Sequence, residues 1–128
     1  SGLAYYAASS LSAGIGPGSW TISAGVNPAD VQKAADLIVS ELARFVAAGV
    51  TQQELSDNQD NYVGRLPLSL ESNGGVAGAL LNIERNELGL DYYREYAGKI
   101  RVVRRQDVQA AAVKFIDPER LAIAIAGP

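Results

Sequence analysis

The feature that most constrains the fold is a change in the spacing of apolar residues at position 27. Residues 19–26 alternate, and small or polar side chains separate the apolar ones, which is the period of a half-buried strand. The apolar face holds Trp20, Ile22, Ala24 and Val26. From Asn27 to Gly49 apolar residues recur at helical spacing instead. A strand that leads directly into a long amphipathic helix predicts a sheet with helices packed on it.

A second extended segment precedes the alternating one. Residues 3–12 carry two tyrosines among small residues, and the glycine-rich stretch 13–18 between the two segments is typical of a hairpin turn. Tyr5 and Tyr6 are consecutive on this strand, so we expect them to point to opposite faces. One should enter the core, while the other offers its hydroxyl on the small, open face of the sheet.

The rest of the chain is predicted to be helical, apart from its last residues. Asn27 and Pro28 suit the cap and first position of the first helix, and Thr51 with Glu54 forms a capping-box sequence before the second, which Pro67 should end. Further helices are expected over residues 73–88, 91–97 and 108–116. Residues 121–126 alternate again and predict a closing strand.

These elements predict an α+β fold. We expect residues 1–128 to form a single unit with a small antiparallel or mixed sheet of about three strands, in the order strand, strand, helices, strand. Four to five helices should pack on one face of that sheet. Its two open edges predict either missing strands or a partner.

Composition excludes several classes of site. The chain contains no His and no Cys, so it cannot supply an imidazole base, a thiolate nucleophile or a His-ligated zinc site. Its net charge of −3 argues against a nucleic-acid partner, and no apolar run approaches the roughly 20 residues of a membrane span. Because Met is also absent, we expect the chain to be part of a longer protein.

Most polar clusters are typical of turns and solvated helix surfaces rather than of catalytic or binding sites. The glycine-rich stretch 14–18 lacks the Lys-Ser/Thr of a phosphate loop and joins two strands. Asp57 and Asp60 lie three apart among polar residues, as on a solvated helix face. Arg104 and Arg105 fall near the start of the last helix, where the helix dipole disfavours cations. Either they are solvated or they pair with acidic groups on a missing domain, and Asp107 compensates in part.

Tyrosine dominates the aromatic residues, with six against two Phe and one Trp. Tyr92, Tyr93 and Tyr96 have helical spacing, which predicts that they pack one amphipathic segment against the core. Whichever of Tyr5 and Tyr6 faces the open side of the sheet is the best candidate for a functional residue.

Several motifs, in their order along the chain, match a known pattern. Positions 2–5 read Gly-Leu-Ala-Tyr before a strand of small residues, and positions 49–55 read Gly-Val-Thr-x-x-Glu-Leu. Together with the segments that follow, they resemble the insulinase/pitrilysin-type zinc metallopeptidases, which include the mitochondrial processing peptidases. The further segments are 67–72, 88–93, 100–108 and 117–128. The resemblance covers essentially the whole chain.

The resemblance implies the second half of a catalytically silent C-terminal domain. In that family paired homologous domains or subunits enclose a chamber that degrades or trims peptides, and the His-x-x-Glu-His zinc site lies in the N-terminal domain. It therefore implies no cofactor and no catalytic residue on this chain, with zinc in the N-terminal catalytic domain or a partner subunit. Tyr5 is implied to contact the peptide substrate, together with an arginine ahead of the first residue. Arg104 stands where the family usually has Thr.

We therefore expect a non-catalytic, substrate-contacting part of a zinc-dependent endopeptidase that is inactive alone. One alternative is a catalytically dead scaffold or core subunit of a related complex. Another is a free-standing α+β binding module, which should be monomeric and melt cooperatively. A half-domain with an uncovered sheet should instead self-associate into a dimer or higher oligomer.

Overall fold

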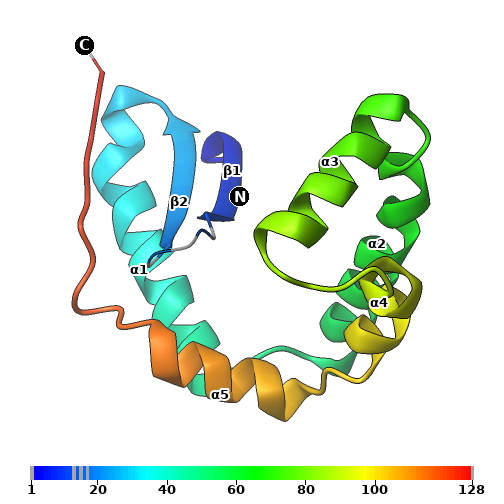
Figure 1. Ribbon diagram of the computed structural model, residues 1–128. Helices are drawn as coiled ribbons and strands as arrows, with labels where there is room; N and C mark the ends of the chain where they lie inside the picture. The colour runs from blue at the N-terminus through cyan, green and yellow to red at the C-terminus, as the bar shows by residue number, and fades with distance from the viewer. Residues whose placement is uncertain (1, 13, 15, 17, 128) are drawn as a thin grey trace. The chain divides into compact units, whose positions relative to one another are not determined.

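The computed structural model of the chain describes residues 2–12, 14, 16 and 18–127 (Figure 1). The chain divides into two compact units. One consists of Ser1–Ala48 with Val113–Pro128 and is called the sheet unit below; the other, Gly49–Ala112, is called the helical unit. In the part described, no helix has both the length and the apolar character needed to cross a membrane.

The sheet unit begins with an antiparallel hairpin of β1 (Ala4–Ser12) and β2 (Ser19–Val26). Leu11 lies opposite Trp20 and Ser9 opposite Ile22, so the predicted pairing of the two segments is confirmed. Positions 13, 15 and 17 of the predicted turn lie outside the described residues. The register shifts between Ala4 and Tyr6, which places a β-bulge at Tyr5.

A long helix covers the apolar face of β2. A 3-10 turn, η1 (Pro28–Asp30), leads into α1 (Val31–Ala48), in which Ala34 and Leu42 are buried. The other members of the predicted apolar stripe are half-buried: Val31, Ala35, Ile38, Phe45 and Val46. The predicted amphipathic helix is therefore confirmed, because its apolar side is the side that loses contact with water.

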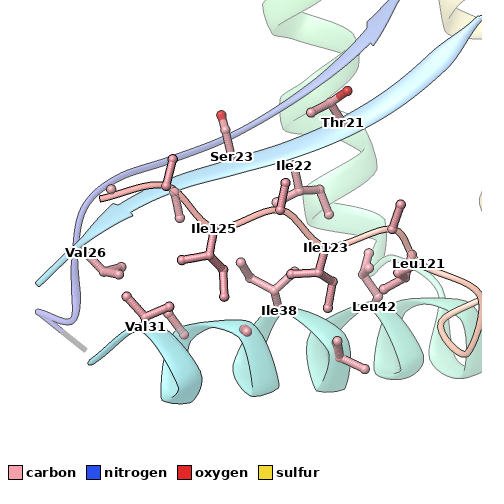
Figure 2. A pocket seen from close by; sticks show the side chains of 18 of the residues that line it. Thr21, Ile22, Ser23, Val26, Val31, Ile38, Leu42, Leu121, Ile123 and Ile125 are labelled. Atoms are coloured by element: carbon pink, nitrogen blue, oxygen red, sulfur yellow. The ribbon is translucent and has the colours of Figure 1, made fainter. Parts of the chain in front are cut away.

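The predicted closing strand over residues 121–126 is wrong. Residues 121–127, called the C-terminal segment below, form no ladder, and the sheet among the described residues consists of β1 and β2. The segment extends beside α1 and β2, with Leu121, Ile123 and Ile125 directed toward α1 (Figure 2). Alternation places these side chains on one face, but a strand also needs a hydrogen-bonded neighbour, and the segment has none among the described residues.

The helical unit opens with α2 (Gln52–Ser69). The predicted capping box is confirmed: the Glu54 N–H donates to Thr51 Oγ1 at 3.1 Å, and the Thr51 N–H donates to Glu54 Oε2 at 2.7 Å. The helix continues two residues past Pro67, so the expected end is slightly too early. Proline lacks an N–H donor, and so near the last turn it removes only one hydrogen bond.

The later helices differ from prediction at their ends. α3 (Asn73–Arg85) stops three residues before Leu88, because the Leu88 N–H donates to the Ile83 carbonyl at 3.0 Å while Glu87 adopts a φ of 52°. That pairing closes a helix in a Schellman motif. α4 (Tyr92–Arg101) is longer than expected, and α5 (Arg105–Phe115) starts earlier.

Side chains tie the helical unit together. Gln59 Nε2 on α2 donates to the Ile100 carbonyl at 2.9 Å and to the Val103 carbonyl at 3.0 Å, at the end of α4. Leu55, Ile83 and Ala112 are buried. With two strands and five α-helices among the described residues, the α+β class is confirmed with one strand fewer than expected.

Candidate substrate-contacting site

Tyr5 lies at the bulge near the start of β1. Its side chain is 76% exposed, and its hydroxyl donates a hydrogen bond of 2.7 Å to Asn27 Oδ1. Bulges change the direction of a side chain relative to the regular pleat. The site therefore consists of an exposed phenol at the strand start, tied to the residue that follows β2.

Asn27 has a different role from the predicted one. It occupies the cap position of η1, and its carbonyl accepts from the Asp30 N–H at 2.9 Å, but its side chain makes no cap hydrogen bond. The expected side-chain cap is wrong because the amide oxygen accepts from Tyr5 instead. Sequence reasoning missed this pair. No sequence pattern indicated it, because the contact depends on the bulge that displaces Tyr5 beside the Ala4–Val26 pair.

The expectation that one of the two tyrosines enters the core is wrong. Tyr6 is 59% exposed, so neither ring is buried. Tyr6 lies opposite Gly25, where an added Cβ would be 2.4 Å from the Tyr6 ring carbon Cε1. The missing side chain of Gly25 lets the ring lie across the strand, and the bulge at Tyr5 interrupts the strict alternation on which the prediction depended.

The face of β2 that turns away from α1 is small and polar. Thr21 and Ser23 are exposed on it and point away from the helix (Figure 2). All nine residues of β1 are exposed as well. Short side chains beside an exposed backbone leave room for an extended peptide to approach closely.

The tyrosine cluster of α4 belongs to the helical unit. Tyr92, Tyr93 and Tyr96 are half-buried, with ring centroids 5.1 to 6.3 Å apart, and the Asn82 amide donates to the Tyr93 hydroxyl at 3.0 Å. Burial, followed by the neighbouring phenols, raises the pKa of Tyr96. A raised pKa keeps the phenol protonated, which suits packing rather than proton transfer.

The charged residues singled out in the sequence mostly have partners nearby. Asp57 accepts from Gln53 at 2.7 Å, and Asp60 pairs with Arg101 at 2.6 Å. Arg105 donates to the Val50 carbonyl at 2.6 Å. The Arg104 N–H donates to Asp107 Oδ2 at 2.8 Å, so Asp107 does compensate for the missing cap side chain.

Zinc favours imidazole and thiolate ligands, and the sequence contains no His and no Cys. Among the residues described, no three acidic side chains gather to hold a metal ion.

In comparisons with known proteins, a family model matches the part of the chain that contains Tyr5 and the β1–β2 hairpin. Residues 1–62 match the family model described as the Peptidase M16 inactive domain. No curated protein matches the chain significantly. The matched residues include β1, β2 and α1 and end within α2. Over residues 1–62, just under half of its length, the chain is therefore similar to the inactive domain of the M16 peptidases.

Proposed function

We propose that this chain is the substrate-contacting, non-catalytic portion of a zinc-dependent endopeptidase. Tyr5 is the residue that meets the peptide. The observation that carries the proposal is the 76% exposure of Tyr5 within the segment that matches the inactive domain. The small, open sheet face beside this exposed phenol supports contact with an extended substrate, because short side chains let a peptide approach the backbone.

What the Tyr5 hydroxyl can do depends on whether it donates its hydrogen bond to Asn27 or to the substrate. A phenol donates one hydrogen bond and can accept others. While the Tyr5 hydroxyl donates to Asn27, its oxygen can still accept a hydrogen bond from a substrate N–H. When it leaves Asn27, it can donate to a substrate carbonyl or to the oxyanion that develops on it, a type of contact that stabilises the transition state. Asn27 is then a positioning residue that holds the ring at the bulge.

The metal and the peptide-bond chemistry belong elsewhere in this proposal. Zinc, when bound to a partner's His-rich site, activates water for hydrolysis. We assign it to an N-terminal catalytic domain or a homologous partner subunit that forms a peptide chamber with this chain. The chain's own contributions are to bind the substrate, orient it and present the Tyr5 hydroxyl.

Steady-state kinetics of Tyr5→Phe in the complete peptidase assembly test the proposal. Loss of a hydrogen bond that is stronger in the transition state should lower kcat/KM roughly 10- to 100-fold. Tyr62→Phe is the matched control, because Tyr62 is a 57% exposed tyrosine in the helical unit. Unchanged turnover by Tyr5→Phe would show that the phenol does not serve the reaction.

A scaffold role makes a different prediction for the same residues. If Tyr5 only fastens the strand start to Asn27, then Tyr5→Phe and Asn27→Ala should lower the melting temperature alike. Turnover would then follow the folded fraction in both variants. In our proposal Asn27→Ala keeps the phenol and retains more activity than Tyr5→Phe at equal stability.

We also propose that the isolated chain self-associates through its sheet. β1 pairs with β2 on one side only, and all nine of its residues are exposed. Such an edge is a template for pairing with another strand. Light scattering should report a dimer or higher oligomer, and a strict monomer at all concentrations would contradict this expectation.

A further inference from the structure

One asparagine of the chain is followed by glycine. The chain has six asparagines: Asn27, Asn58, Asn61, Asn73, Asn82 and Asn86. Of these, Asn73 alone precedes a glycine, Gly74. Asparagine is thermolabile because its side-chain amide can be attacked by the next backbone nitrogen. That nitrogen is least hindered in glycine, which has no Cβ, so the sequence concentrates this reactivity at the Asn73–Gly74 pair.

The side-chain amide of Asn73 has no partner to hold it. Asn73 is exposed at the first position of α3, and among the described residues its side chain makes no hydrogen bond. The amides of four other asparagines do take part in hydrogen bonds: Asn27, Asn58, Asn82 and Asn86. The Asn73 amide is therefore free to turn toward its own backbone.

The backbone nitrogen of Gly74 is free as well. It lies in the first turn of α3, where N–H groups have no helical acceptor, and Ser72 Oγ accepts from the Gly75 N–H instead, at 3.0 Å. A Cβ added at Gly74 would meet nothing closer than Ser72 Oγ, at 3.9 Å. Asn61 differs, because the next residue lies inside α2, where its N–H belongs to the helical ladder.

The first turn of α3 opens easily, which ring closure requires. Gly74 and Gly75 both have low helix propensity. Ser72 fastens the turn, since its Oγ accepts from the Gly75 N–H and its carbonyl accepts from the Val76 N–H, both at 3.0 Å. Helix ends open at a small fraction of the free energy of global unfolding. The Ser72 cap is thus the main protection of Asn73.

We propose that Asn73 is a site of spontaneous deamidation through a succinimide formed with Gly74. The Gly74 nitrogen bonds to Asn73 Cγ, the bond from Cγ to the amide nitrogen breaks, and ammonia leaves with the proton that Gly74 gives up. Water then opens the succinimide at either carbonyl and leaves aspartate or isoaspartate. The net reaction consumes one water and releases one ammonia, with no oxidant or reductant. The site is separate from Tyr5 and does not depend on the function proposed there.

Both products change the start of α3. Each makes the net charge of −3 more negative by one carboxylate. Aspartate at the first helical position places this charge beside free N–H groups, which stabilises the helix. Isoaspartate adds a methylene to the main chain and so separates the Ser72 hydroxyl from the Gly75 N–H. Its misplaced carboxylate is the chemical group that an isoaspartyl methyltransferase modifies with S-adenosylmethionine.

Peptide mapping of the full-length protein after incubation at mildly alkaline pH tests the proposal. Trypsin cleaves after Arg65 and Arg85, so one fragment contains both Asn73 and the internal control Asn82. We expect the fragment to gain the mass difference between an amide and an acid, at Asn73 and not at Asn82. An isoaspartyl methyltransferase should label part of this product. Digestion in heavy-oxygen water marks any conversion that occurs only after the protein has been unfolded.

A synthetic peptide of residues 70–77 sets the time scale. Because the first turn of α3 opens readily, Asn73 in the protein should convert within roughly tenfold of the rate in the peptide. No conversion of Asn73 in the protein after the peptide has converted completely would overturn the proposal.

Two substitutions test the mechanism. Gly74→Ala places a methyl group in open space, so α3 should stay folded while the hindered nitrogen slows deamidation at least roughly tenfold. Ser72→Ala removes the cap and should speed deamidation roughly fivefold, the factor expected for the loss of one N-cap. Circular dichroism checks that both variants remain folded. Equal rates in wild type and Gly74→Ala would show that the Gly74 nitrogen is not the nucleophile and would overturn the proposal.

Discussion

The helical unit satisfies its own polar groups, whereas the sheet unit leaves a large part of its backbone unpaired. In the helical unit, Thr51 and Glu54 cap α2, Gln59 holds the carbonyls at the end of α4, and Arg105 donates to the Val50 carbonyl. In the sheet unit, β1 has one neighbour and the C-terminal segment has none among the described residues. The comparison therefore distinguishes a unit whose helix ends are capped from a unit whose extended backbone keeps open hydrogen-bonding groups.

Exposed apolar side chains occur in both units. In the sheet unit, Leu121, Ile123 and Ile125 stay 38%, 61% and 64% exposed although they point toward α1. In the helical unit, Leu81 and Leu90 are also exposed, while the large rings of α4 pack against one another. Apolar surface beside unpaired backbone marks a place where another chain can add both contacts and hydrogen bonds.

The largest expected difference between the units is in core truncation. Leu55→Ala in the helical unit should lower the free energy of unfolding by about 3 kcal/mol, and Leu42→Ala in the sheet unit by about 2 kcal/mol. Both leucines are buried, but Leu42 borders a cavity in the sheet unit and so has fewer neighbours to lose. Chemical denaturation followed by Trp20 fluorescence and by circular dichroism measures both. If Leu42→Ala lost more free energy of unfolding than Leu55→Ala, then Leu42 would not border an open cavity.

A smaller difference is expected between the two helix starts. Thr51→Ala removes a capping-box side chain and should cost about 1 kcal/mol. Asn27→Ala removes no cap bond, only the exposed hydrogen bond from Tyr5, and should cost about 0.5 kcal/mol. A double-mutant cycle with Tyr5→Phe checks the second value, since Asn27→Ala should add almost nothing once the phenol is gone. If the effects of Asn27→Ala and Tyr5→Phe were fully additive, Tyr5 would not be the hydrogen-bond partner of Asn27.

The smallest effect concerns the surface charges of α4. The hydrogen bond and charge of Lys99 hold the pKa of the Glu95 carboxyl below its ordinary value of 4.5. A pKa lowered by folding stabilises the folded state above pH 4.5, and this contribution disappears as the pH falls through the lower, folded value. Glu95→Gln should therefore lower the melting temperature slightly at pH 7, and the difference should shrink as the pH is lowered below 4.5.

Salt provides the control for this last prediction. Glu95 and Lys99 are both exposed, so about 1 M salt should largely abolish the difference between wild type and Glu95→Gln at pH 7. A difference that persists in high salt and in acid would show that the substitution changes the helix in another way.

The sequence predicted well those elements that depend only on residues close together in the chain. The α1 stripe and the Thr51–Glu54 capping box follow from residue spacing alone, and both were confirmed. The end of α3 was placed too late because Glu87 takes a left-handed conformation that glycine usually supplies. The closing strand failed because alternation specifies a face but not a hydrogen-bonded neighbour.

The candidate site was predictable only in part. The Gly-Leu-Ala-Tyr motif indicated Tyr5, and the structure exposes that residue. The bulge and the bond to Asn27 depend on the pairing register, which single residues do not specify. Tyr6 was expected to compete with Tyr5 for the open face, but its ring lies over Gly25.

Photo-crosslinking from position 5 tests the central claim most directly. A photoreactive phenylalanine analogue in place of Tyr5, in the complete peptidase assembly, should crosslink to a bound substrate peptide. The same analogue in place of Tyr62 is the control. We predict a peptide adduct at position 5 that excess unlabelled substrate suppresses, and none at position 62. No adduct at position 5, or equal adducts at both positions, would contradict the account.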